Sequence, residues 1–257
     1  MRALWLAAGT IATAAALFAA TALLWNGFAN AEPPSELSRG SFPDQGSQVR
    51  LFVGEGVSTV LVQSGEAGEV VVERLVRWTL EKPEVTEEWG AGTLRLGTDC
   101  TMTARRRGTS CSVDYIIQVP PEASLEADTA SASLELARIH GGVRVTSVSG
   151  DVQVDSTPGD LYVRSGSGDV DAMSIGGERA DVEIGTGRVR LVFQKPPADV
   201  RAVVRTTGSV AVEVPQEAAY DVSVEAPRVD VNVRRDSGAA RRISASVAEG
   251  TIDVCCD

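Results

Sequence analysis

The stretch GGVRVTSVSGDVQVDSTPGDLYVRSGSGDV, residues 141–170, contains the pattern that decides the fold. Apolar and polar residues alternate in it, as in the segment Val143–Val145. This alternation is typical of β-strands with one face in a core and one face in solvent, because successive side chains point in opposite directions. The tetrapeptide Ser-Gly-Asp-Val begins at Ser149 and again at Ser167, eighteen residues later. The stretch therefore predicts short strands that recur at a fixed interval.

Glycine residues separate these strands at equal distances. Gly150, Gly159, Gly168 and Gly177 are nine residues apart, and Asp follows the first three. Glycine can adopt the positive φ of a tight corner, and the following carboxylate can bond the local backbone. A short period of strand and turn is typical of a solenoid. We therefore predict an all-β fold, a β-solenoid or β-helix-like stack of ~9-residue strand–turn units over residues 121–254. An antiparallel β-sandwich is the alternative that regular spacing also permits.

The composition of the second half agrees with this prediction. Residues 141–254 contain 23 Val, four Ile and only two Leu. Branched Cβ atoms are stiff and suit a pleated surface better than a helix. The polar residues between them should form a ladder on the outside of the stack, which a partner could contact. Its expected members are Arg144, Gln153, Tyr162, Asp171, Glu183 and Arg190.

The first half also predicts strands, but with less regular spacing. We expect residues 49–120 to form an irregular N-terminal cap of one β-repeat domain that extends over 49–257, because solenoids need atypical ends. Trp78 and Trp89 lie in this cap, where they suit core packing or, alternatively, ligand stacking. The strand candidates are residues 49–53, 59–63, 69–78, 93–96 and 112–119.

The N-terminus is a targeting segment. Residues 3–25 carry no charge and are long enough to span a bilayer, which needs about 20 apolar residues. Arg2 precedes them, which keeps the N-terminus cytoplasmic and exports the rest of the chain. We predict a transmembrane anchor over residues 1–31, with a signal peptide cleaved before Glu32 as the alternative. Residues 32–48, rich in Pro, Gly and Ser, predict a flexible linker between this segment and the β domain.

Charge and composition exclude several functions. The chain has 257 residues, 24 Lys and Arg, 35 Asp and Glu, and a net charge of −11, which argues against nucleic-acid binding. A single His argues against a histidine-ligated metal and a Ser-His-Asp triad. Asp151, Asp160 and Asp169 resemble calcium-binding repeats in spacing, but the Gly-Gly-x-Gly-x-Asp motif is missing. We therefore expect these residues to form turns, and we expect no enzyme activity, metal or cofactor.

The cysteines predict disulfide chemistry outside the cytoplasm, where thiols oxidise. Cys100 and Cys111 are the expected pair. Cys255 and Cys256 could form a vicinal bond, bond another chain or stay free. Arg105, Arg106 and Arg107 lie between the first two cysteines. They are a candidate contact for anionic envelope polymers or lipid headgroups, with a solvated loop tip as the alternative.

The segment SVDYIIQVP at residues 112–120, followed by Leu125 and the Ser-Gly-Asp-Val repeats, resembles a known family. This is the bacterial β-strand-repeat "putative adhesin" family, a domain of unknown function, and the resemblance covers residues 49–254. It implies a β-solenoid-like domain that is exported or membrane-anchored, and it supplies no catalytic residues and no ligand. One departure is residues 129–133, TASAS, where the expected glycine is missing.

The sequence thus predicts a non-catalytic, membrane-tethered scaffold that binds partners outside the cytoplasm. The expected location is the cell membrane, with a single span and the C-terminal domain extracytoplasmic. The expected partners are the membrane, through the N-terminal helix, and a cell-envelope polymer or another envelope protein. The alternative function is an accessory or sensory subunit of an envelope signalling or stress system. The oligomeric state is left open.

Overall fold

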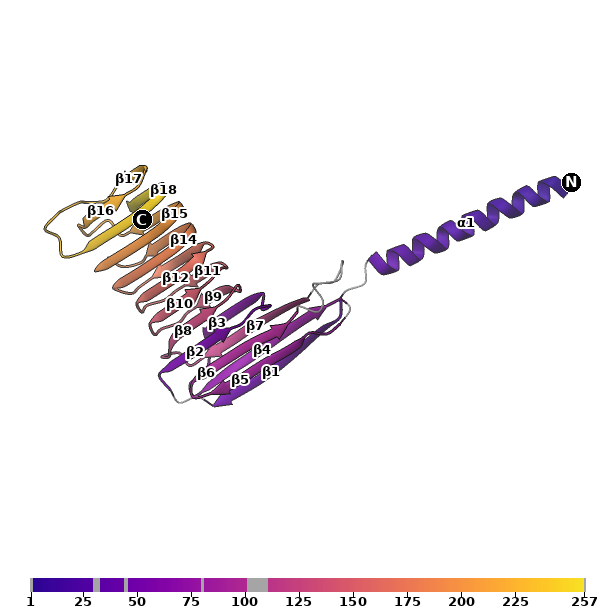
Figure 1. Ribbon diagram of the computed structural model, residues 1–257, viewed down its shortest axis with the longest axis horizontal. Helices are drawn as coiled ribbons and strands as arrows, with labels where there is room; N and C mark the ends of the chain where they lie inside the picture. The colour runs from indigo at the N-terminus through magenta and orange to yellow at the C-terminus, as the bar shows by residue number, and fades with distance from the viewer. Residues whose placement is uncertain (1, 30–32, 44–45, 80, 101–110, 257) are drawn as a thin grey trace. The chain divides into compact units, whose positions relative to one another are not determined.

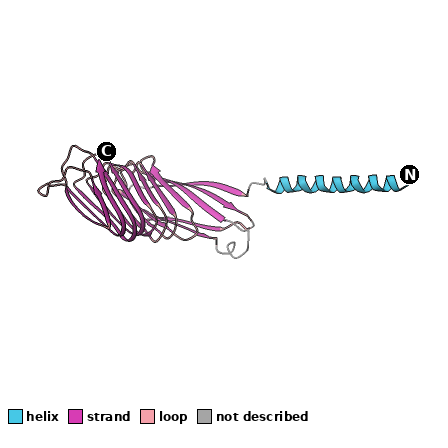
Figure 2. Cartoon of the chain, turned by 90° about the horizontal axis from the view of Figure 1, so that it is seen from above, coloured by secondary structure: helices cyan, strands magenta, loops and turns pink. Residues whose placement is uncertain are grey.

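The computed structural model describes residues 2–29, 33–43, 46–79, 81–100 and 111–256 (Figure 1). The chain divides into two compact units, Met1–Pro34 and Ser35–Asp257. The first unit contains helix α1 (Arg2–Ala29), the only helix in the described residues (Figure 2). Its segment Gly9–Gly27 is long and apolar enough to cross a membrane, a property that signal sequences share.

The second unit is a β-solenoid in which each coil has two strand segments. One segment lies on the face that contains β12 (Leu161–Ser167), which we call the β12 face. The other lies on the face that contains β13 (Val170–Ile175), which we call the β13 face. Three coils use two separate strands, and three use one long strand that crosses from one face to the other. The separate strands are β8 (Ser124–Thr129) and β9 (Ser133–Ala137), β10 (Val143–Ser147) and β11 (Val152–Asp155), and β12 (Leu161–Ser167) and β13 (Val170–Ile175). The long strands are β14 (Arg179–Phe193), β15 (Asp199–Val214) and β18 (Arg242–Cys256).

Parallel pairing between equivalent residues of successive coils confirms the solenoid. Val143 pairs with Leu125 on one side and Leu161 on the other, so these coils are eighteen residues long. Leu161 then pairs with Ala180, and Ala180 with Val200, so the next coils are one and two residues longer. The parallel register excludes the antiparallel sandwich for these coils, because hairpins would pair them in opposite directions.

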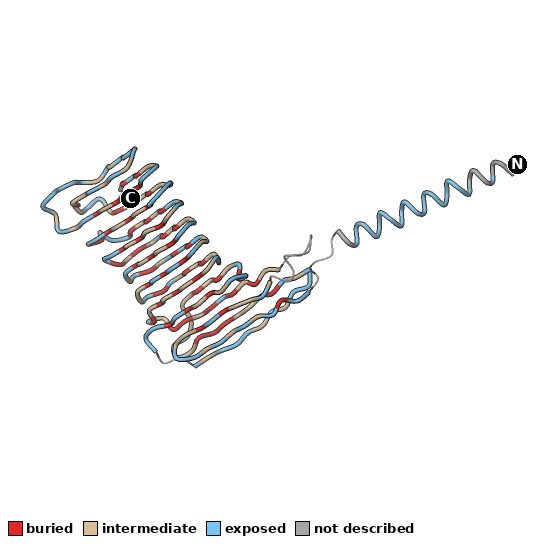
Figure 3. The backbone as a smooth tube through the Cα atoms, in the orientation of Figure 1, coloured by how far each residue is buried: buried red, intermediate tan, exposed pale blue. Residues whose placement is uncertain are grey.

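The inward side chains form one continuous core along the stack. Its members are mainly Val, Leu and Ile at alternate positions, as the sequence pattern predicts. Figure 3 shows these buried positions alternating with half-buried or exposed ones along the coils. All of the buried core residues belong to Ser35–Asp257, so this unit contains its own core.

Glycine is required at the corners chiefly because successive coils approach closely. A Cβ atom on Gly150 would lie 2.5 Å from the carbonyl oxygen of Ala132 in the preceding coil. Gly150 and Gly168 also have positive φ values of 107° and 116°, as expected. Gly159 stands at the opposite corner, where a Cβ atom would collide with the carbonyl oxygen of Gly141. Positive φ is therefore only part of the reason for the nine-residue glycine period.

The aspartates after these glycines bond to the next coil, which corrects the expected bond to their own turn. Asp151 Oδ1 accepts a hydrogen bond from the backbone N–H of Asp169 at 2.9 Å. Asp169 Oδ1 in turn accepts one from the N–H of Arg188 at 2.8 Å. At the opposite corner, Asp160 Oδ1 accepts from the N–H of Arg179 at 3.1 Å. These carboxylates fix the register between coils.

The N-terminal part contains two further coils, which lie out of chain order. One coil, β2 and β3, pairs in parallel with β8 and β9. The other coil, β6 and β7, pairs in parallel with β2 and β3 on their other side. Antiparallel strands β4, β5 and β1 complete this end. The bounds are β2 (Gln48–Val53), β3 (Thr59–Ser64), β4 (Glu69–Trp78), β5 (Glu84–Gly90), β6 (Thr93–Asp99) and β7 (Cys111–Val119).

The linker predicted over residues 32–48 is wrong for most of its length. Strand β1 (Ser35–Pro43) pairs antiparallel with β4 along all nine of its residues. Phe42 stacks on Trp89 with ring centroids 5.8 Å apart, and Arg39 pairs with Glu73 at 3.1 Å. Among the strands that the structure describes, β1 pairs with β4 alone, so it is an outermost strand, where a proline is tolerated.

The C-terminal end also departs from chain order. After β15 the chain forms β16 (Asp221–Glu225) and β17 (Arg228–Val231) and only then returns as β18. β18 pairs in parallel with β15 on one side and with β16 and β17 on the other. β18, the last strand in the sequence, therefore forms the coil next to the end of the stack. β16 and β17, which precede it in the sequence, form the end itself.

Candidate functional site

A network of charged side chains covers the middle of the β12 face. It arises because the outward positions of successive coils carry opposite charges. Asp181 pairs in register with Arg201 of the next coil, and Arg164 pairs with Glu183. Opposite charges on directly facing residues stabilise neighbouring strands. The partners of these two pairs lie nineteen and twenty positions apart in sequence, so the coil length brings them together.

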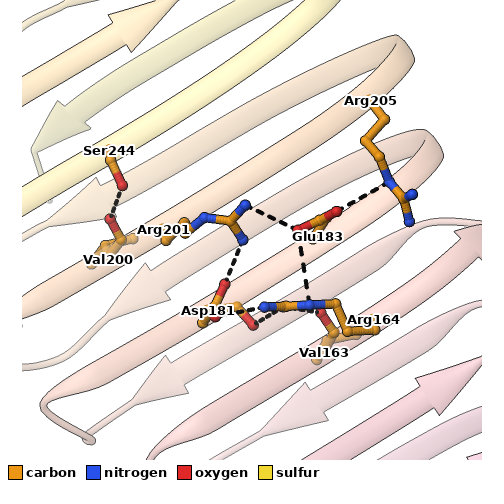
Figure 4. A network of polar contacts seen from close by, with 8 residues as sticks. All are labelled: Val163, Arg164, Asp181, Glu183, Val200, Arg201, Arg205 and Ser244. Atoms are coloured by element: carbon orange, nitrogen blue, oxygen red, sulfur yellow. Dashed lines mark hydrogen bonds and ion pairs between the residues drawn. The ribbon is translucent and has the colours of Figure 1, made fainter.

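Three guanidinium groups share two carboxylates in this network (Figure 4). Asp181 accepts from Arg164 Nη2 at 2.6 Å and from Arg201 Nη1 at 2.9 Å. Glu183 accepts from Arg201 Nη2 at 3.0 Å, and its other oxygen lies 3.1 Å from Arg205 Nε. Three positive charges against two negative ones leave one excess positive charge on this part of an acidic protein.

The hydrogen bonds of the network favour the ionised form of Asp181. Partial burial alone raises the pKa of the Asp181 carboxyl, but the hydrogen bonds and charges of Arg164 and Arg201 outweigh it and hold the pKa below the ordinary value. The bond to Asp181 also raises the pKa of Arg201. The arrangement suits ion pairing and the binding of anionic groups, because guanidinium groups present several fixed donors.

Tyr162 connects this network to the preceding coil. The guanidinium carbons of Arg144 and Arg164 each lie 4.0 Å from the centroid of its ring. Arg164 also donates through Nη1 to the carbonyl oxygens of Val163 and Asp181. Cation–π contacts of this kind orient an arginine as well as stabilise it. The result is a rigid row of polar side chains across three coils.

Two depressions flank the network on the same face. A groove of about 380 Å³ lies over Tyr162, between Arg144 and Arg179. A trough of about 590 Å³ lies beside Arg205 and Glu225, and residues with small side chains such as Ser246 and Ala248 line the rest of it. Groove, network and trough together form an extended surface, which we call the polar surface.

The expected outward ladder is divided between two faces, which corrects the sequence prediction. Arg144, Tyr162 and Glu183 lie on the β12 face. Gln153, Asp171 and Arg190 lie on the β13 face, in strands that pair with one another. Because one coil includes two nine-residue units, a nine-residue spacing leads from one face to the other. Only residues about eighteen apart share a face.

The structure places the predicted cysteines as follows. Cys100 and Cys111 form a disulfide with an S–S distance of 2.06 Å, as expected. Cys255 and Cys256 are half-buried free thiols in the described residues. Burial raises the pKa of the Cys255 thiol, and the carboxylates of Asp253 and Glu213 raise it further. This thiol is therefore protonated and weakly nucleophilic near neutral pH.

The remaining predicted site falls outside the described structure. Arg105, Arg106 and Arg107 lie in residues 101–110, which the structure does not describe. No group of three or more His, Cys, Asp or Glu that could hold a metal ion occurs among the described residues. Sequence reasoning overlooked Arg164, Asp181, Arg201 and Arg205. The alternation of charge at spacings of seventeen to twenty-two residues was the signal that could have found them.

A family model described as Toastrack DUF4097 matches residues 122–254, which is just over half of the chain. The chain belongs to this family. The match confirms the resemblance to the β-strand-repeat "putative adhesin" proteins, and it coincides with the coils from β8 to β18. A search of curated proteins finds no match to the chain.

A comparison with solved structures finds matches at low sequence identity. A "putative adhesin" from Bacteroides fragilis NCTC 9343 is 11% identical, with a TM-score of 0.50 over 89% of this chain and 100% of that protein. A "putative cell adhesion protein" from Clostridium sporogenes ATCC 15579 is 12% identical, with a TM-score of 0.38 over 88% of this chain and 100% of that protein. The similarity to the Bacteroides structure agrees with the β fold described above.

Proposed function

We propose that this Toastrack protein is a non-catalytic, membrane-tethered scaffold whose β domain binds an anionic cell-envelope polymer outside the cytoplasm. The observation that carries the proposal is the polar surface. Its central network holds three guanidinium groups against two carboxylates, on a chain whose overall charge is strongly negative. A linear polymer could follow it across successive coils, from the groove over Tyr162 to the trough beside Arg205.

Several further features support this function. The apolar helix α1 is long enough to serve as a membrane anchor. The single charge before Glu32 is Arg2, which favours export of the β domain. The Cys100–Cys111 disulfide fits an oxidising compartment. The carboxylates at the centre of the polar surface hold arginines, an arrangement that suits binding rather than proton transfer. The solved structure from Bacteroides carries the description "putative adhesin".

The first test is co-sedimentation of residues 33–257, oxidised, with isolated cell-wall material. This fragment retains every buried core residue, so we expect it to fold. We expect pelleting at low salt that is lost at high salt, because exposed ion pairs are screened. The double variant Arg201→Gln and Arg205→Gln should abolish it. Arg188→Gln, an exposed arginine at a corner of the coil, is the matched control.

The loop arginines form a second arm of the same experiment. Replacing Arg105, Arg106 and Arg107 with Ser tests whether they also contact the polymer. Loss of pelleting only in this triple variant would move the contact from the polar surface to the loop. Absence of salt-sensitive pelleting by the unmodified fragment would refute polymer binding.

Tethering needs a separate measurement on the full chain. Cells are fractionated, and membranes are washed with alkaline carbonate, which removes peripheral proteins. We expect the full chain to stay with the membrane and an external protease to digest the β domain in intact cells. Recovery of a soluble form that begins at Glu32 would instead establish cleavage and secretion.

A further inference from the structure

The groove over Tyr162 differs from the rest of the polar surface in how its charges are matched. Its carboxylates are Glu126, Asp160 and Asp181. Glu126 accepts from Arg50 at 3.0 Å and Gln48 at 3.2 Å. Asp181 is held within the network, and Asp160 accepts from the N–H of Arg179. Each negative group of the groove therefore already has a donor.

The two arginines of the groove are not matched in this way. Arg144 and Arg179 both line it, and neither guanidinium forms an ion pair within the part of the chain that the structure describes. Arg144 belongs to the β10 strand and Arg179 to the start of β14, so they lie two coils apart on either side of Tyr162. The groove thus combines satisfied acceptors with unsatisfied donors.

Stacking orients Arg144 for a ligand. Its guanidinium carbon lies 4.0 Å from the centroid of the Tyr162 ring. A guanidinium that stacks on a ring keeps its N–H donors at the edge of its plane, where they match the two oxygens of an oxyanion. Little side-chain entropy is then lost on binding, because the side chain is already ordered.

We propose that the groove over Tyr162 binds an oxyanion group, a carboxylate or a phosphate, carried by a sugar-sized molecule or polymer unit. Arg144 is the primary contact, and Arg179 is a second donor. The volume of about 380 Å³ suits one such unit, since small-molecule sites begin near 300 Å³. Glu126 and Asp160 can accept hydrogen bonds from hydroxyl groups of the same unit. This inference rests on the proposed function and names the chemistry of one subsite.

The test uses three sugars that share one ring and differ at one carbon: glucuronate, glucose 6-phosphate and glucose. Each is titrated into residues 33–257 at low ionic strength, with binding followed by calorimetry and by amide chemical shifts. We expect saturable binding of at least one anionic sugar and none of glucose. The stronger of the two anionic sugars identifies the group as carboxylate or phosphate. Shifts should centre on Arg144, Tyr162 and Arg179.

Variants assign the contact. Arg144→Gln should weaken binding about tenfold or more, and Arg144→Lys should also weaken it, because the planar fork is lost while the charge remains. Tyr162→Leu should weaken binding by releasing Arg144, and Arg188→Gln should not change it. A thermal melt of each variant shows that the fold is retained.

Three results would overturn the inference: no binding of either anionic sugar, equal binding of glucose, or unchanged affinity in Arg144→Gln. The cell-wall experiment distinguishes this failure from failure of the proposed function. If wall binding is salt-sensitive and needs Arg201 and Arg205 while the sugars do not bind, only the groove assignment fails. If the sugars bind at Arg144 but the wall does not pellet the protein, the polymer proposal fails and the subsite remains.

Discussion

The two ends of the solenoid are closed by different means. At the N-terminal end, antiparallel strands carry large side chains, and the Phe42–Trp89 stack connects β1 with β5. There the Arg74–Glu87 pair, at 2.8 Å, lies beside the buried Tyr115, whose pKa rises through burial and the nearby Glu87 charge.

At the C-terminal end, the last coil is parallel and valine-rich. β16 and β17 add only short strands there, and Val229 remains 44% exposed. The N-terminal end is therefore covered by strands that depart from the repeat pattern, whereas the C-terminal end keeps that pattern. As a result, the core is more completely covered at the N-terminal end than at the C-terminal end. We expect the stability of the molecule to decrease toward β16 and β17.

The largest expected effect is at the sealed end. Arg74→Ala should lower the free energy of unfolding by roughly 2–4 kcal/mol, because Glu87 is left charged and mostly buried. Urea denaturation of residues 33–257 measures this. Arg77→Ala is the control, since its pair with Asp114 is exposed and should contribute under about 1 kcal/mol. Equal losses in the two variants would contradict the special role of the Arg74–Glu87 pair.

The disulfide gives the next effect at the same end. Cys100→Ser with Cys111→Ser should cost about 2–3 kcal/mol, because a short covalent loop that connects β6 and β7 is opened. Thermal unfolding with and without reductant checks it. A reductant should leave the melting of the double variant unchanged. A loss below about 0.5 kcal/mol, against about 1.4 kcal/mol for a tenfold change in the unfolding equilibrium, would contradict this role of the disulfide. It would show that side-chain packing alone stabilises this end.

A matched pair of valines compares the middle of the stack with its open end. Val189 and Val229 occupy equivalent inward positions, but Val189 is fully buried. Val189→Ala should cost about 2 kcal/mol and Val229→Ala under about 1 kcal/mol, because a buried truncation loses transfer energy and leaves a cavity. Hydrogen exchange should also be faster in β17 than in β13. Similar costs would mean that the C-terminal end is covered.

The smallest expected effect is the loss of folding stability at acidic pH that arises from Asp181. This residue belongs to the polar surface, which lies between the two ends of the solenoid. The folded-state pKa of Asp181 lies below its unfolded value, so its stabilising contribution is present above the unfolded value and disappears as pH falls through the folded one. Its side chain is 37% exposed, and solvent screening keeps the effect small. Asp181→Asn should therefore flatten the acid limb of a stability curve below about pH 4. An unchanged limb would show that Asp181 is not linked to folding.

Much of the fold was predictable because it depends on local patterns. Alternation located strands such as β4, whose predicted and observed bounds agree. The nine-residue glycine spacing predicted the strand–turn unit, two of which form each eighteen-residue coil. β1 was missed because proline and glycine normally interrupt strands, and only its outermost place makes them acceptable. The outward pattern identified Arg144, Tyr162 and Glu183 of the polar surface. Its other charged members were missed because they are distant in sequence and become neighbours only through coil stacking.

By itself, the sequence determined the β class, the nine-residue strand–turn unit, the inward positions and the Cys100–Cys111 pair, because each follows from side chains near one another in the chain. Only the tertiary structure decided which coils are neighbours at the ends. There β2 lies between β6 and β8, β3 lies between β7 and β9, and β18 pairs with β16. The physical reason is that backbone hydrogen bonds are the same for every residue, so alternation fixes the face of a strand but not its partner. The same stacking created the groove at Arg144, since its two arginines are thirty-five residues apart.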